Sequence, residues 1–116
     1  DGLDEITISG DTLICELKAK KINKFSLNPT DAGLKESPLE EIKGGDPQYN
    51  AKAIINLLDG DKNAYRDIVL INSAAALMIS DKTNNIRDGV ELASKSIDTG
   101  SAKNALKKLI EMSNKN

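Results

Sequence analysis

The sequence has no histidine and no tryptophan, and its aromatic residues are limited to two tyrosines and one phenylalanine. So few rings provide no platform on which the bases of a single-stranded nucleic acid could stack. Acidic and basic residues are interspersed, the net charge is -2, and the chain has no extended block of one sign. A chain without a basic stripe is not expected to bind nucleic acid.

Cysteine and long apolar runs are also scarce. Cys15 is the single cysteine, which excludes an internal disulfide, and its apolar neighbours predict a small buried side chain rather than a reactive thiol. The longest mostly apolar run, Ile68–Ile79, is shorter than the roughly 20 residues that span a bilayer. These features predict a cytoplasmic protein without a membrane segment. The first residue is Asp1 rather than methionine, which predicts a chain that begins within a longer protein.

Residues 1–116 are expected to form a single unit, because the charged fraction of 29% and the hydrophobic fraction of 39% are ordinary for a globular protein. Apolar and polar residues alternate over about residues 5–27, a pattern typical of β-strands in an antiparallel meander. The predicted strands are Ile6–Ser9, Leu13–Leu17 and Ile22–Leu27. Residues 28–46 carry prolines and glycines without periodicity and predict a connecting loop. Helices are expected over residues 47–114, so the fold class is α+β, with short antiparallel strands followed by about four helices.

The four predicted helices differ in the side that should be buried. The first begins at Asp46 and Pro47, an acidic N-cap followed by proline, and the last begins with Ser101 as its cap. The second is apolar nearly all round and should be surrounded by other elements, with Asn72 and Ser73 satisfying backbone or neighbouring helix groups. The inward positions expected elsewhere are Ala51, Ile54, Ile55 and Leu58 in the first helix, Ile86, Val90, Ala93 and Ile97 in the third, and Ala102, Leu106, Leu109 and Ile110 in the fourth.

Asp4 and Glu5 are adjacent acids directly ahead of a predicted strand, and the flexible Gly2 precedes them. Two neighbouring carboxylates in such a loop can hold hydrated Mg²⁺ while a phosphorylated ligand completes its coordination. Adjacent acids on a solvated terminus are far commoner than metal sites, so the spacing alone leaves both interpretations open.

Lys43, Gly44, Gly45 and Asp46 form a second candidate site. A glycine pair at a helix N-terminus could bind phosphate through backbone amides. The same residues are also typical of a flexible turn into a capped helix, and the full glycine-rich fingerprint is missing, which favours the turn.

Several segments, in the same order along the chain, resemble those of anthranilate phosphoribosyltransferases. Residues 1–7 resemble the family's Asp-Gly-Leu-Asp-Glu segment, and residues 27–34 its Pro-x-Asp-x-Gly-Leu stretch. Residues 43–51 are similar to the Gly-Gly-Asp helix start, residues 72–77 to the Asn-Ala-Ala-Ala-Ala-Leu helix, and residues 89–93 to the penultimate helix. The resemblance implies a C-terminal portion of the α/β catalytic domain of the nucleoside phosphorylase and phosphoribosyltransferase type.

The resemblance implies that Asp4 and Glu5 bind Mg²⁺ on phosphoribosyl diphosphate, in an enzyme that transfers the phosphoribosyl group to anthranilate for tryptophan biosynthesis. The family's Gly-Thr-Gly-Gly-Asp and Lys-His-Gly-Asn-Arg loops and its N-terminal helical domain, through which it forms homodimers, have no counterpart here. The isolated chain is therefore expected to be inactive. Two alternatives stay open at this point: a non-catalytic relative that binds nucleic acid, and a nucleoside phosphorylase.

Overall fold

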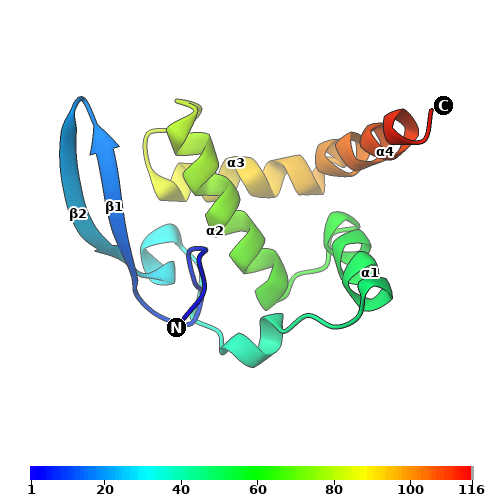
Figure 1. Cartoon of the computed structure of the whole chain (residues 1–116), viewed down its shortest axis with the longest axis horizontal. Coiled ribbons are helices and arrows are strands. Elements are labelled where there is room, and N and C mark those ends of the chain that lie inside the picture. The colour runs from blue at the N-terminus through cyan, green and yellow to red at the C-terminus, as the bar shows by residue number, and fades with distance from the viewer. Residues whose placement is uncertain (116) are drawn as a thin grey trace.

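The computed structural model describes residues 1–115, and Figure 1 shows a β-hairpin at one end of the long axis and the last helix at the other. The elements, in chain order, are β1 (Thr12–Lys18), β2 (Lys21–Leu27), the 3-10 helices η1 (Pro29–Ala32) and η2 (Leu39–Ile42), and the helices α1 (Pro47–Leu58), α2 (Ala64–Ile79), α3 (Ile86–Asp98) and α4 (Ser101–Ser113). The predicted α+β architecture with four helices is confirmed. The segment predicted as an irregular loop contains the two short 3-10 helices, so that part of the prediction was incomplete.

The β-sheet over residues 1–115 has two strands rather than the three predicted. β1 and β2 pair antiparallel from Thr12 with Leu27 to Lys18 with Lys21. The turn uses Ala19 and Lys20 at φ 49° and 64°, and left-handed residues at both central positions match the twist of a two-residue hairpin. The strand predicted at Ile6–Ser9 is wrong, because side chains and a distant loop take up the backbone groups of this segment, as described below.

One face of the hairpin carries apolar side chains that are open to solvent. Leu13 and Leu17 are 78% and 73% exposed, and Cys15 between them is exposed as well. Ile14, on the opposite face, packs against the core. The expected burial of Cys15 is therefore wrong. Alternation along a strand identifies its two faces, but a sheet that packs on one side buries only one of them.

The core lies where α2 crosses α3, at the centre of the molecule (Figure 1). Ile71 and Ala74 of α2 are completely buried, and most other α2 side chains are buried or half-buried, as predicted for a helix surrounded by other elements. Gly89 explains how close the two helices come. A Cβ atom built on Gly89 would lie 2.7 Å from Cβ of Ala74 and 2.9 Å from its Cα, so only glycine fits there.

Helix starts follow the predicted local chemistry more closely than helix faces do. The Asp46 carboxylate accepts a hydrogen bond from the Tyr49 amide at 2.8 Å and Pro47 follows, as predicted for the start of α1. The expected cap at Ser101 is wrong by one position, because Gly100 is the N-cap at φ 76° and Ser101 is the first residue of α4. The α3 stripe is confirmed, with its apolar side chains buried or half-buried against the core.

The expected inward faces of α1 and α4 are only partly correct. In α1, Ile54 and Ile55 are 42% and 49% exposed, whereas Leu57 is buried and Leu58 half-buried. In α4, Ala102 packs against the core, but Leu109 and Ile110 are 64% and 52% exposed. Each helix touches the core along one flank only, so its apolar stripe is wider than the surface that the described residues cover.

Candidate functional site

Asp4 and Glu5 lie in an exposed loop that precedes β1, and this loop is closed on itself. The Asp1 carboxylate accepts a hydrogen bond from the Leu3 amide at 3.0 Å and another from the Ser9 hydroxyl at 3.1 Å. Gly2, at φ 91°, supplies the left-handed backbone that this tight turn requires. The loop therefore presents the acidic pair at its outer edge, with its two ends tied together.

Asn72 of α2 binds the backbone immediately after the acidic pair. Its Oδ1 accepts a hydrogen bond from the Ile6 amide at 3.0 Å, and its Nδ2 donates to the Ile6 carbonyl at 2.9 Å. The same Nδ2 donates to the Ile68 carbonyl of its own helix at 2.9 Å. The prediction that Asn72 satisfies backbone groups is confirmed, although the sequence did not indicate which ones.

The residues after Ile6 anchor the loop in the protein. Thr7 and Ile8 are buried, at 4% and 0% exposure. The Thr7 amide donates to Oγ1 of Thr12 at 3.1 Å, and the Ile8 carbonyl accepts from the Ser37 amide at 2.9 Å. These bonds replace the strand ladder that the sequence predicted for this segment. A short alternating run forms a strand only where a neighbouring strand is available to pair with it.

The carboxylates of Asp4 and Glu5 are exposed, and neither has a hydrogen-bond or ion-pair partner among residues 1–115. No cluster of three or more metal-ligating side chains occurs within the same residues. Two carboxylates are too few for an all-protein metal cage, but they suit Mg²⁺, which keeps several waters and is commonly shared with substrate phosphates. The donor set therefore fits a shared Mg²⁺ site, and the metal-binding role of the pair stays a prediction.

The turn at residues 43–46 is the second predicted candidate. The Gly45 amide donates to Oδ1 of Asn50 at 2.8 Å, and Nδ2 of Asn50 donates back to the Gly45 carbonyl at 3.0 Å. Asp46 is occupied as the N-cap of α1. The Gly45 amide and the Asp46 carboxylate are both taken up within the turn, as in a capped helix start, and these bonds favour the capped-turn interpretation over a phosphate site.

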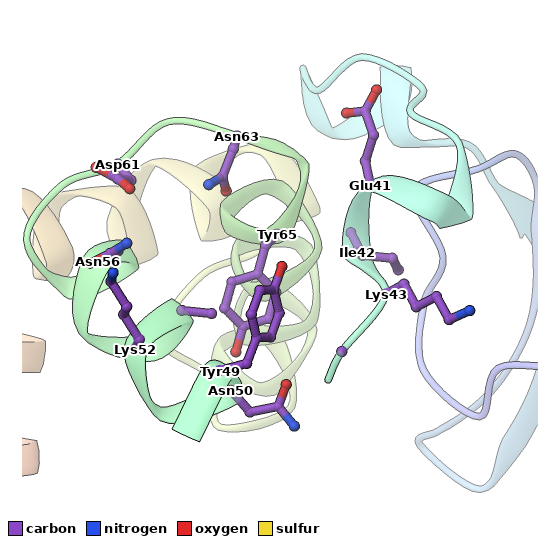
Figure 2. Close-up of a pocket in the computed structure, with 12 residues that line it drawn as sticks. Glu41, Ile42, Lys43, Tyr49, Asn50, Lys52, Asn56, Asp61, Asn63 and Tyr65 are labelled. Atoms are coloured by element: carbon purple, nitrogen blue, oxygen red, sulfur yellow. The ribbon is translucent and has the colours of Figure 1, made fainter. Parts of the chain in front are cut away.

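A cavity of about 650 Å³ lies beside this turn, and Figure 2 shows residues from η2 on one side and from α1 and α2 on the other. Its lining combines Tyr49 and Tyr65 with the charged side chains of Glu41, Lys43 and Lys52. Asp4 and Glu5 do not line it. The cavity is therefore separate from the predicted metal-binding pair.

The buried Arg66 and the half-exposed carboxylate of Asp98 form a link between α2 and α3 that sequence reasoning missed. Arg66 is 3% exposed, and its Nη2 donates to Oγ of Ser94 and to Oδ1 of Asp98, each at 2.8 Å. The hydrogen bond from Arg66 holds the pKa of Asp98 below its ordinary value. Arg66 at the start of a largely apolar helix indicates that a buried cation needs a partner. Its partner Asp98 is 32 residues away, so the sequence pattern does not identify the pair. The link supports the helix pair that carries Asn72.

The family model for the glycosyl transferase family, a/b domain, matches residues 1–103. The chain belongs to this family. It is 50% identical over 114 residues to an anthranilate phosphoribosyltransferase of Parvibaculum lavamentivorans, covering 98% of this chain and 33% of the relative. A second anthranilate phosphoribosyltransferase, from Xanthobacter autotrophicus, is also 50% identical, covering 99% of this chain and 33% of the relative. The predicted resemblance is confirmed. The chain spans about a third of the length of these two relatives.

Solved structures agree with this family assignment. Anthranilate phosphoribosyltransferase from Thermus thermophilus superposes with a TM-score of 0.85 at 32% identity, over 93% of this chain and 32% of that one. The Saccharomyces cerevisiae enzyme in complex with PRPP and Mg superposes with a TM-score of 0.85 at 29% identity, over 95% of this chain and 32% of that one. Within residues 1–115, no helix has the length and apolarity to cross a membrane.

Proposed function

We propose that this chain is the C-terminal part of an anthranilate phosphoribosyltransferase of tryptophan biosynthesis, and that Asp4 and Glu5 are its Mg²⁺ ligands. The main support is the 50% identity over 98% of the chain to a relative of that name. The yeast neighbour in complex with PRPP and Mg supports the metal and the first substrate, and the one in complex with 4-fluoroanthranilate supports the second. The exposure of the two carboxylates, which have no hydrogen-bond or ion-pair partner among residues 1–115, supports the ligand assignment.

In the proposed reaction, the amino nitrogen of anthranilate bonds to the anomeric carbon of phosphoribosyl diphosphate. The bond from that carbon to the diphosphate oxygen breaks, the electron pair leaves with diphosphate, and the amino nitrogen loses a proton. Mg²⁺, when bound, neutralises the charge that grows on the departing diphosphate. Asp4 and Glu5 hold the metal in a loop whose shape α2 and the Asp1 hydrogen bonds fix. Neither carboxylate is needed as a general base.

The proposal also concerns what this chain does not carry. The diphosphate and anthranilate loops that the family resemblance implies have no counterpart in its sequence, so the isolated chain is proposed to be inactive. The whole enzyme is proposed to be a cytoplasmic homodimer that associates through its N-terminal helical region. The isolated chain should form no fluorescent phosphoribosyl anthranilate from both substrates and Mg²⁺, and product above the enzyme-free rate would contradict this.

The ligand assignment is tested in a full-length enzyme that carries this chain. Replacing both acids, as Asp4→Asn with Glu5→Gln, should lower turnover at limiting Mg²⁺ by about 100-fold, the usual scale for losing a group that stabilises charge at the reacting centre. Turnover is followed as the release of diphosphate across a Mg²⁺ titration. Glu40→Gln, an exposed acid on η2, serves as the matched control and should leave the titration unchanged. An unchanged Mg²⁺ dependence in the double variant would refute the assignment.

A further inference from the structure

We infer that Asn72 is a positioning residue for the acidic pair: it fixes Asp4 and Glu5 in the geometry that binds the metal. The inference rests on the proposed function. Asn72 is 66 residues from Ile6 in the sequence, and nothing in the local pattern connects them. In the structure its amide group binds both polar atoms of the Ile6 backbone, at 3.0 and 2.9 Å.

The bonding of Asn72 leaves little freedom at this junction. An asparagine side chain has one carbonyl oxygen and two N–H donors, and here the oxygen accepts one bond while the nitrogen donates two. The bond to the Ile68 carbonyl fixes the amide relative to α2. The pair of bonds to Ile6 then fixes the orientation of the peptide, as well as its distance from the helix. Glu5 immediately precedes Ile6, and the Ile6 amide belongs to the peptide that joins them, so the clamp fixes the backbone at Glu5.

Asn72 is the hydrogen-bonding anchor that lies nearest to the acidic pair along the chain, because the buried Thr7 and Ile8 follow only after Ile6. Before the pair, the bonds of Asp1 to Leu3 and Ser9 tie the loop only to itself. The clamp, by contrast, is on α2, next to the completely buried Ile71. A metal site needs carboxylates that are already in place, and outer hydrogen bonds that orient ligands commonly account for about tenfold to about 100-fold in metal affinity. The Asn72 clamp has the geometry for this role.

The test measures metal binding rather than turnover, in a full-length enzyme that carries this chain. Mn²⁺ replaces Mg²⁺, and its free fraction is measured by electron paramagnetic resonance in the presence of phosphoribosyl diphosphate. Asn72→Ala should weaken Mn²⁺ binding by about tenfold. Asn72→Asp keeps the acceptor for the Ile6 amide but loses both donors. It should also weaken binding, although it adds a negative charge near the metal.

Asn72→Asp separates geometry from simple charge attraction. If Mn²⁺ affinity depended only on the negative charge near Asp4 and Glu5, this variant would bind Mn²⁺ more tightly. That result would overturn the inference. Ile71→Val is the matched control, since it removes one buried methyl group from the same turn of α2 and keeps the Asn72 side chain that bonds to Ile6. Its Mn²⁺ affinity should match the parent enzyme, and a loss equal to that of Asn72→Ala would overturn the inference by showing a general effect of helix stability.

Hydrogen exchange gives a second, independent measurement. In Asn72→Ala, amide protection should fall at Ile6, while the α2 amides around Ile71 keep theirs. Unchanged exchange at Ile6, or failure of both Asn72 variants to fold, would also overturn the inference, because the residue would then act on the whole fold.

The failure of this inference is distinguishable from failure of the proposed function. Loss of Mn²⁺ binding in the Asp4 and Glu5 double variant with retention in Asn72→Ala would reject only the clamp. Retention in both would reject the metal assignment itself.

Discussion

The α2 and α3 pair and the α1 and α4 helices carry similar apolar residues, but they bury them very differently. Ile71 of α2 is completely buried, whereas Ile55 of α1 is 49% exposed and Ile110 of α4 is 52% exposed. The first pair comes close because Gly89 faces Ala74 and because Arg66 of α2 is bonded to Asp98 of α3. The comparison teaches that the protein has a packed centre, which carries the Asn72 clamp, and an outer side whose apolar surface is open among the described residues.

The largest difference in stability should come from truncating an isoleucine to alanine, once in α2 and once in α1. Ile71→Ala should lower the free energy of unfolding by about 2–5 kcal/mol, because it deletes buried methyl groups and leaves a cavity. Ile55→Ala should cost less than about 1 kcal/mol, because the side chain is half in water already. Urea denaturation of the chain, followed by circular dichroism, measures both. Equal costs would show that the two regions do not differ in packing as described.

The Gly89 contact should give the next largest effect, with a sign opposite to the usual one. Replacing a glycine inside a helix by alanine normally stabilises the helix by about 1 kcal/mol. Gly89→Ala should instead destabilise the protein by about 1–3 kcal/mol, because its methyl group would overlap Ala74.

Denaturation of Gly89→Ala, of Ala74→Gly and of the double variant forms a thermodynamic cycle. A favourable but partial coupling is expected, because Ala74→Gly removes the Cβ atom at 2.7 Å but leaves the backbone Cα at 2.9 Å. A Gly89→Ala variant as stable as the parent protein would contradict the close approach of α2 and α3.

The link between Arg66 and Asp98 should show itself in the pH dependence of stability. The pKa of Asp98 in the folded protein lies below its ordinary value of 3.8. The ionised carboxylate therefore stabilises the fold above about pH 3.8, and this stabilisation is lost as the pH falls toward the folded pKa. Asp98→Asn should therefore lower the melting temperature at neutral pH, and the difference from the parent protein should shrink below about pH 4.

Asp67 is retained in both proteins, so it does not disturb that difference. Burial raises the pKa of Asp67. Protonation of Asp67 therefore makes the fold more stable as the pH falls, whereas protonation of Asp98 makes it less stable. Glu91→Gln, an exposed acid on α3, is the control and should leave the melting curve unchanged at each pH. A melting-temperature difference for Asp98→Asn that stays constant from neutral pH to below about pH 4 would contradict the assigned pKa direction.

The smallest effect is expected on the open side. Ile55→Lys should change the free energy of unfolding of the chain by no more than about 0.5 kcal/mol, as for an ordinary surface position. The same change should reduce self-association, because it breaks an exposed apolar surface. Sedimentation velocity at increasing concentration measures the association, and Asn56→Lys on the same helix separates the loss of the apolar side chain from the added charge. A large loss of stability would show that Ile55 is part of the core.

Sequence reasoning succeeded where the determinants are local. The Asp46 and Pro47 start of α1, the α3 stripe and the positions of the two hairpin strands all depend on residues a few positions apart. It failed for the strand at Ile6–Ser9 and, in part, for the inward faces of α1 and α4. Those features depend on whether another element lies alongside, and periodicity contains no information about that.

The candidate site shows the same division. The sequence by itself determined the acidic pair, its oxygen chemistry and the family resemblance, because the two acids are adjacent and the resemblance depends only on the order of short segments along the chain. Only the tertiary structure decided that Asn72 holds the backbone next to Glu5 and that Arg66 joins Asp98. The physical reason is that each of these contacts joins groups far apart in the chain, and the packing of α2 against α3 and against the first loop brings them within hydrogen-bond distance.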